Sequence, residues 1–92
     1  MNIVIYDAAA YKEPDGKWRI KYTILHNDVD DNKRGMLFHL AHIQIEKYLE
    51  VKFESEIVVY PYPPNYYVPK NEAEEVQFIL KFPTLNNMSF EI

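Results

Sequence analysis

Residues 13–24 read EPDGKWRIKYTI, a tight-turn sequence followed directly by an alternating run. Pro14 fixes φ at the first corner of a turn, and Gly16 accepts the positive φ that hairpin turns often require. From Trp18 onwards apolar and polar side chains alternate, which is the period of a strand with one buried face. Residues 2–6, before the turn, are rich in β-branched and aromatic side chains. The pattern predicts an antiparallel hairpin.

The period changes after the polar loop at residues 27–35. Over residues 33–49 apolar side chains recur on a broad helical arc, which predicts one largely buried helix. The arc consists of Met36, Leu37, Leu40, Ala41, Ile45 and Tyr48. The remaining narrow polar face consists of His39, His42, Glu46 and Glu50. Alternation around residues 49–54 indicates that a strand replaces the helix somewhere between residues 47 and 55.

The second half of the chain contains two further strand patterns. Residues 57–60 are wholly apolar and predict a strand core. Residues 60–69, YPYPPNYYVP, predict an extended connection or an edge, because proline lacks the N–H that a central strand needs. Residues 76–82 alternate again and predict a strand that Pro83 ends, and residues 84–92 predict a short edge strand.

These elements predict the α+β class, with an antiparallel sheet of about four strands and one main helix packed on one face, in the order β-β-α-β-β. The chain has 92 residues and is 48% hydrophobic, so we expect a single globular domain, residues 1–92. Cysteine is absent, no run of about 20 apolar residues occurs, and the N-terminus lacks a basic signal region. We therefore expect a soluble, cytoplasmic protein.

The negative charge is concentrated in the second part of the chain. The formal net charge is −4, and residues 1–34 contribute six basic and six acidic side chains, which cancel. Residues 35–92 contribute four basic and eight acidic side chains, which account for the whole surplus. An acidic field disfavours nucleic acid and anionic membranes as direct ligands, because binding phosphate requires clustered lysine and arginine. Basic proteins are the favoured partners.

Ten of the fourteen carboxylates fall in three clusters. The clusters are Asp28, Asp30 and Asp31; Glu46, Glu50, Glu54 and Glu56; and Glu72, Glu74 and Glu75. Residues two apart on a strand lie about 6.8 Å apart, and phosphates of one DNA strand advance about 3.4 Å each. A row of strand glutamates therefore matches every second phosphate. We predict that all three clusters bind the partner. The second and third clusters would form two acidic tracks, which a homodimer would lengthen. The alternative is that the carboxylates only keep the domain soluble, because Lys47, Lys52 and Lys70 would interrupt the tracks.

With these clusters, its small size and its lack of cysteine, the chain resembles the phage anti-restriction nuclease (Arn) type of DNA mimic. The resemblance covers the size of the whole chain and the three clusters. It implies a non-enzymatic inhibitor, without a cofactor, that presents a DNA-like surface to a host DNA-binding protein. A restriction enzyme or a histone-like protein in the host cytoplasm is the implied target.

Two other functions compete with this one. Tyr62, Tyr66 and Tyr67 could form a protein-binding surface without DNA mimicry, because aromatic side chains are enriched at interfaces; the alternative is that their rings cover the sheet. His39, His42 and Glu46, spaced along one helix, could belong to a metal-dependent enzyme. The His-Glu-x-x-His pattern is absent and no further histidine or cysteine is clustered nearby, so we expect no metal site.

Overall fold

The computed structural model describes residues 2–26, 34–54 and 65–91, and it has the predicted α+β class. Within these ranges the elements are, in chain order, β1 (Asn2–Lys12), β2 (Trp18–His26), α1 (Arg34–Leu49), β3 (Phe53–Glu54), β4 (Tyr66–Tyr67), α2 (Glu72–Lys81), the 3-10 helix η2 (Phe82–Leu85) and β5 (Ser89–Glu91). Neither α-helix is long and apolar enough to cross a bilayer, within the part of the chain described.

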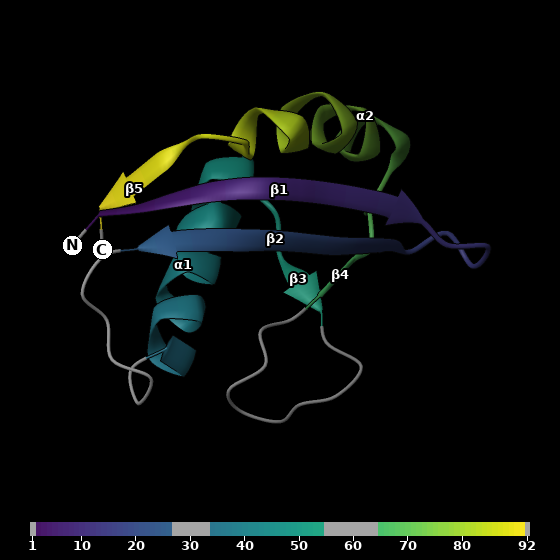
Figure 1. Ribbon diagram of the computed structural model, residues 1–92. Coiled ribbons are helices and arrows are strands. Elements are labelled where there is room, and N and C mark those ends of the chain that lie inside the picture. The colour runs from purple at the N-terminus through teal and green to yellow at the C-terminus, as the bar shows by residue number, and fades with distance from the viewer. Residues whose placement is uncertain (1, 27–33, 55–64, 92) are drawn as a thin grey trace.

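The strands form one antiparallel sheet in the order β3-β4-β2-β1-β5 (Figure 1). β1 and β2 form the predicted hairpin, in which Lys12 pairs with Trp18. At its turn Gly16 has φ +91° and donates its N–H to the carbonyl of Glu13 at 2.9 Å. β5 pairs with the start of β1 at one edge of the sheet. This confirms the predicted hairpin and the predicted short edge strand.

The core lies on one face of the sheet, and α1 crosses this face behind β1 and β2 in the view of Figure 1. Alternate residues of the hairpin point into the core, namely Ile3, Ile5, Ile20 and Ile24. α1 contributes residues at helical spacing, namely Leu37, Ala41, Ile45 and Leu49. The predicted main helix on one face is confirmed. Its end at Leu49 and the start of β3 at Phe53 lie inside the predicted interval of residues 47–55.

The orientation predicted for α1 is partly wrong. His42, which we assigned to the polar face, is only 3% exposed, and its ring packs against Phe53 with 5.1 Å between centroids. Met36 and Leu40, which we assigned to the buried arc, are 55% and 39% exposed. The helix is apolar around most of its circumference, so its sequence does not determine which side faces the sheet.

The strand predicted for residues 76–82 is also wrong, because residues 76–81 belong to α2 and Phe82 begins η2. Asn71 caps the helix with its side chain, which accepts the N–H of Glu74 at 2.9 Å. Three glutamates in the first turn favour the same helix, because negative charge stabilises a helix N-terminus. Phe78 and Phe82, four residues apart, are buried, whereas Leu80 between them is 65% exposed. The burial follows a helical period and not the alternation of a strand.

The prediction for residues 60–69 is wrong at Tyr66 and Tyr67. These two residues form β4, which lies between β3 and β2 and is therefore inside the sheet. The exclusion of proline from a central strand does not apply to them, because both have a backbone N–H. The predicted strand core at residues 57–60 and the Tyr/Pro connection up to residue 64 lie outside the described residues.

Candidate functional site

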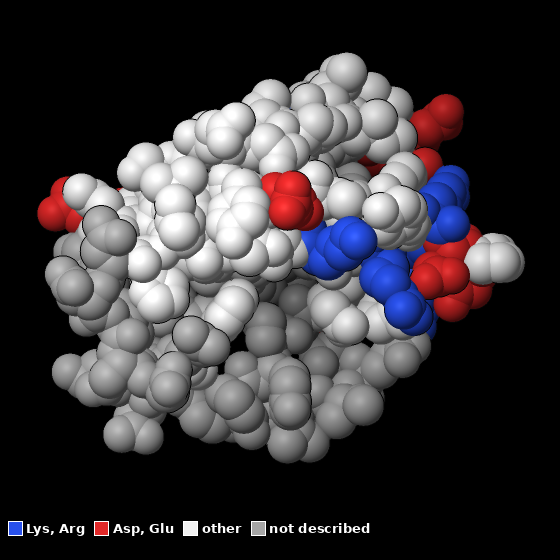
Figure 2. Space-filling view, in the orientation of Figure 1, with Lys and Arg blue, Asp and Glu red and all other residues white. Residues whose placement is uncertain are grey.

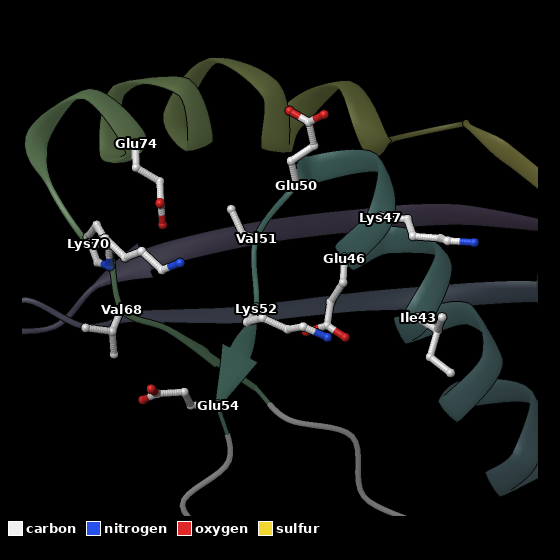
Figure 3. Close-up of a pocket in the computed structure, with 11 residues that line it drawn as sticks. Ile43, Glu46, Lys47, Glu50, Val51, Lys52, Glu54, Val68, Lys70 and Glu74 are labelled. Carbon is white, nitrogen blue, oxygen red and sulfur yellow. The ribbon is translucent and has the colours of Figure 1, made fainter.

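A groove with a volume of about 670 Å³ opens where the C-terminal end of α1, the strand β3 and the beginning of α2 meet (Figure 3). Its lining combines three kinds of side chain. The carboxylates are Glu46, Glu50, Glu54 and Glu74, the ammonium groups are Lys47, Lys52 and Lys70, and the apolar residues are Ile43, Val51, Val68 and Pro69. Two of the predicted acidic clusters, which are far apart in the sequence, thus contribute to one groove.

The end of α1 determines how the chain enters the groove. Glu50 follows the last helical residue with φ +59°, and the N–H of Val51 donates to the carbonyl of Glu46 at 3.2 Å. This bond is the six-residue closure of a Schellman motif, with Glu50 in the position that glycine usually occupies. The reversal leaves Glu50 exposed and directs the chain from Val51 into β3.

Glu46 is directed toward the protein interior. Its Oε2 accepts the backbone N–H of Phe53 at 2.8 Å, and its Oε1 lies 3.2 Å from Nε2 of the buried His42. Glu46 therefore connects α1 to the first residue of β3. Burial raises the pKa of Tyr22 in β2, and the negative charge of Glu46 raises it further. Through its hydrogen bond to Phe53, the carboxylate of Glu46 helps to fix one wall of the groove.

His42 lies in an apolar setting that favours its neutral form. Burial lowers the pKa of His42, the carboxylate of Glu46 opposes that shift, and the charges of His39 and Lys52 reinforce it. Its Nδ1 is buried and has no hydrogen-bond partner within the described residues. His42 is therefore a titratable group in the core beside the wall of the groove.

Glu74 is held on the opposite wall. It accepts a hydrogen bond from the hydroxyl of Tyr67 at 2.7 Å, while its backbone N–H is bound by the Asn71 cap. Tyr67 is fully buried, and its ring stacks on Phe78 with 4.2 Å between centroids. Burial and the bond to Glu74 raise the pKa of Tyr67. The position of Glu74 is consequently fixed by the aromatic core.

The other members of the third cluster do not line the groove. Glu75 forms an ion pair with Lys12 of β1 at 3.0 Å, and this hydrogen bond lowers the pKa of Glu75. Glu72 is exposed in the first turn of α2. Both residues therefore stand outside the surface on which Glu74 meets the second cluster.

The lysines of the groove make its charge mixed. Within the described ranges, Lys47, Lys52 and Lys70 form no ion pair with the four glutamates of the lining. Glu50 and Glu54 likewise have no side-chain partner among the residues described. Among the described residues, the groove thus combines unpaired carboxylates with unpaired ammonium groups, and the three lysines interrupt its acidic surface.

Five predicted site residues lie outside the described residues, namely Asp28, Asp30, Asp31, Glu56 and Tyr62. Tyr66 and Tyr67 are 6% and 0% exposed, and the hydroxyl of Tyr66 accepts a hydrogen bond from Arg19 at 2.7 Å. Both rings are therefore largely removed from solvent, and Tyr67 is part of the hydrophobic core.

The helix histidines do not converge. His39 is exposed and His42 is buried, so the two imidazoles do not share a surface. In the described part of the chain no group of three or more His, Asp or Glu side chains is arranged to hold a metal ion.

The apolar residues of the groove were missed by sequence reasoning. Val51 and Val68 lie next to β3 and β4, and Ile43 lies in α1, where it is 38% exposed. No local pattern marks them, because only tertiary packing brings them together. Comparison with protein-family models, with curated proteins and with solved structures gives no match for this chain.

Proposed function

We propose that the protein is a non-enzymatic inhibitor that offers the carboxylates of this groove to the cationic DNA-binding surface of another protein. The proposed target is a restriction enzyme or a histone-like protein in the cytoplasm. The observation that supports the proposal is the meeting of Glu50 and Glu54 with Glu74 around one groove. Charges from two parts of the chain gathered on one surface attract a cationic partner more strongly than the same charges dispersed.

The location of the other charges is consistent with this choice of surface. The open face of the sheet is largely uncharged, and its charged side chains gather toward the β1–β2 turn, where both signs are mixed (Figure 2). In the groove the carboxylates outnumber the ammonium groups by four to three. The lysines limit the affinity for any cation. We therefore expect the partner to recognise the arrangement of charges in the groove and not its net charge.

Direct binding to a purified histone-like protein tests the proposal. The fluorescently labelled chain is titrated with that protein, and anisotropy is measured at about 50 and about 300 mM salt. We expect the dissociation constant to rise about ten-fold or more with salt, since screening weakens contacts between exposed charges. An unlabelled DNA duplex is expected to compete. Absence of binding to both a histone-like protein and a restriction enzyme would contradict the proposal.

A matched pair of variants separates the groove from net charge. Glu54 and Glu91 are both exposed, and they lie in short strands at opposite edges of the sheet. Glu54→Lys and Glu91→Lys therefore make the same change of charge in different places. We expect Glu54→Lys to weaken binding about five-fold and Glu91→Lys by less than about two-fold. Equal weakening by the two variants would mean that the groove is not the binding surface.

A further inference from the structure

The groove has an apolar strip between two carboxylates. Val51 and Val68 form this strip, Glu74 projects toward it from α2, and Glu54 projects from β3 below Val68 in the view of Figure 3. Val68 is 39% exposed and thus available for contact. Glu54 is also exposed, whereas Glu74 is held in place by Tyr67.

This combination is complementary to an arginine side chain. Arginine has an apolar stem and a planar charged head, so it binds best where an apolar surface leads to carboxylates. The guanidinium carries five N–H donors and can reach two carboxylates at once, which the compact ammonium of lysine does less well. The lining has four glutamates against three lysines, so its net charge disfavours an anion such as phosphate only slightly.

Lys70 already extends into this space. It is exposed and precedes the helix cap Asn71, and its side chain reaches across the groove beneath Glu74 in the view of Figure 3. It forms no ion pair within the described residues. An exposed lysine without a fixed partner among the described residues is displaced at little cost, because surface ion pairs contribute little to stability.

We propose that the groove takes one arginine side chain of the partner, with its stem on Val51 and Val68 and its guanidinium between Glu54 and Glu74. In the free protein, Lys70 occupies part of that space as an internal competitor. This inference rests on the proposed function, since it names the group of the cationic partner that is recognised. The inference predicts that removing the charge of Lys70 and removing the charge of Glu54 change the affinity for arginine in opposite directions.

The probe is an acetylated, amidated tetra-arginine peptide, and binding is measured by isothermal titration at low salt. Lys70→Met keeps most of the side-chain stem and removes its charge, so we expect it to tighten binding about three-fold. Glu54→Gln is expected to weaken binding about three-fold, because it removes a negative charge that attracts the guanidinium. The matched peptide of four citrullines, which has the same shape without the charge, is expected not to bind.

Lys47→Met is the control for net charge. Lys47 also lines the groove, but its side chain points away from the apolar strip in Figure 3. We expect Lys47→Met to change the affinity for tetra-arginine less than Lys70→Met does. Equal tightening by the two variants, or no tightening by Lys70→Met, would overturn the inference.

The outcomes distinguish this inference from the proposed function. If the chain binds the histone-like protein in a salt-dependent way while Lys70→Met leaves tetra-arginine binding unchanged, the inhibitor role stands and the arginine site is wrong. If tetra-arginine binding responds as expected while no DNA-binding protein is bound, the arginine site stands and the inhibitor role is wrong.

Discussion

Replacing Phe78 by alanine is expected to lower the free energy of unfolding by about 3–5 kcal/mol, the usual cost of removing a buried aromatic ring. Phe78 is 2% exposed and lies at the centre of an aromatic cluster. Its ring is 4.2 Å from that of Tyr67, 5.1 Å from that of Phe82 and 5.7 Å from that of Trp18, measured between centroids. A loss of this size is a large fraction of the stability of a small domain, which is typically about 5–15 kcal/mol.

Urea unfolding measures this loss, and Leu80→Ala is its control. Leu80 lies in the same helix and is 65% exposed, so its truncation is expected to cost no more than about 0.5 kcal/mol. If residues 76–82 formed an alternating strand, both side chains would share one face and the two variants would cost similar amounts. Should Phe78→Ala fail to fold, Phe78→Leu provides a milder version of the same comparison.

The second large effect is a dependence of stability on pH that comes from His42. Its folded-state pKa is lowered, chiefly by burial, so the folded protein resists a proton that the unfolded chain accepts near the ordinary value of about 6.5. Stability is therefore full above about pH 6.5 and falls as the pH decreases below it. One proton limits the slope to about 1.4 kcal/mol per pH unit.

Two variants of α1 test the origin of this slope. His42→Phe, which keeps an aromatic ring beside Phe53, is expected to remove most of the loss between pH 7 and pH 5. His39→Gln, on the exposed side of the same helix, is expected to keep it. Free energies of unfolding are measured with urea at each pH. The assignment is wrong if His42→Phe unfolds with the same pH dependence as the natural chain.

The hairpin and the main helix could be predicted from sequence because their signals are local and agree with one another. Gly16 supplies the positive φ of the turn, and the alternation after Trp18 continues for the length of β2. Segment 76–82 was wrongly assigned to a strand. The spacing of four residues between Phe78 and Phe82 fits one face of a strand and also one face of a helix. The capping sequence Asn71-Glu72-Ala73-Glu74 was the local signal that favoured a helix.

The candidate site could be predicted only in part. The clusters that contain Glu54 and Glu74 were recognised from the sequence, and the structure brings these two residues to one groove. Their approach depends on where the tertiary fold places α2 relative to β3, which no local pattern encodes. The burial of His42 was missed for a related reason, because a histidine within an apolar helix can face either solvent or the core.

The central claim is that the groove between α1, β3 and α2 is the surface that binds a cationic partner. The most direct measurement is a nuclear magnetic resonance titration of the isotope-labelled chain with an unlabelled histone-like protein. We predict that the largest amide shifts occur at Lys52, Glu54 and Lys70, which line the groove. Shifts centred instead on the open face of the sheet, around Tyr6 and Leu25, would contradict the account.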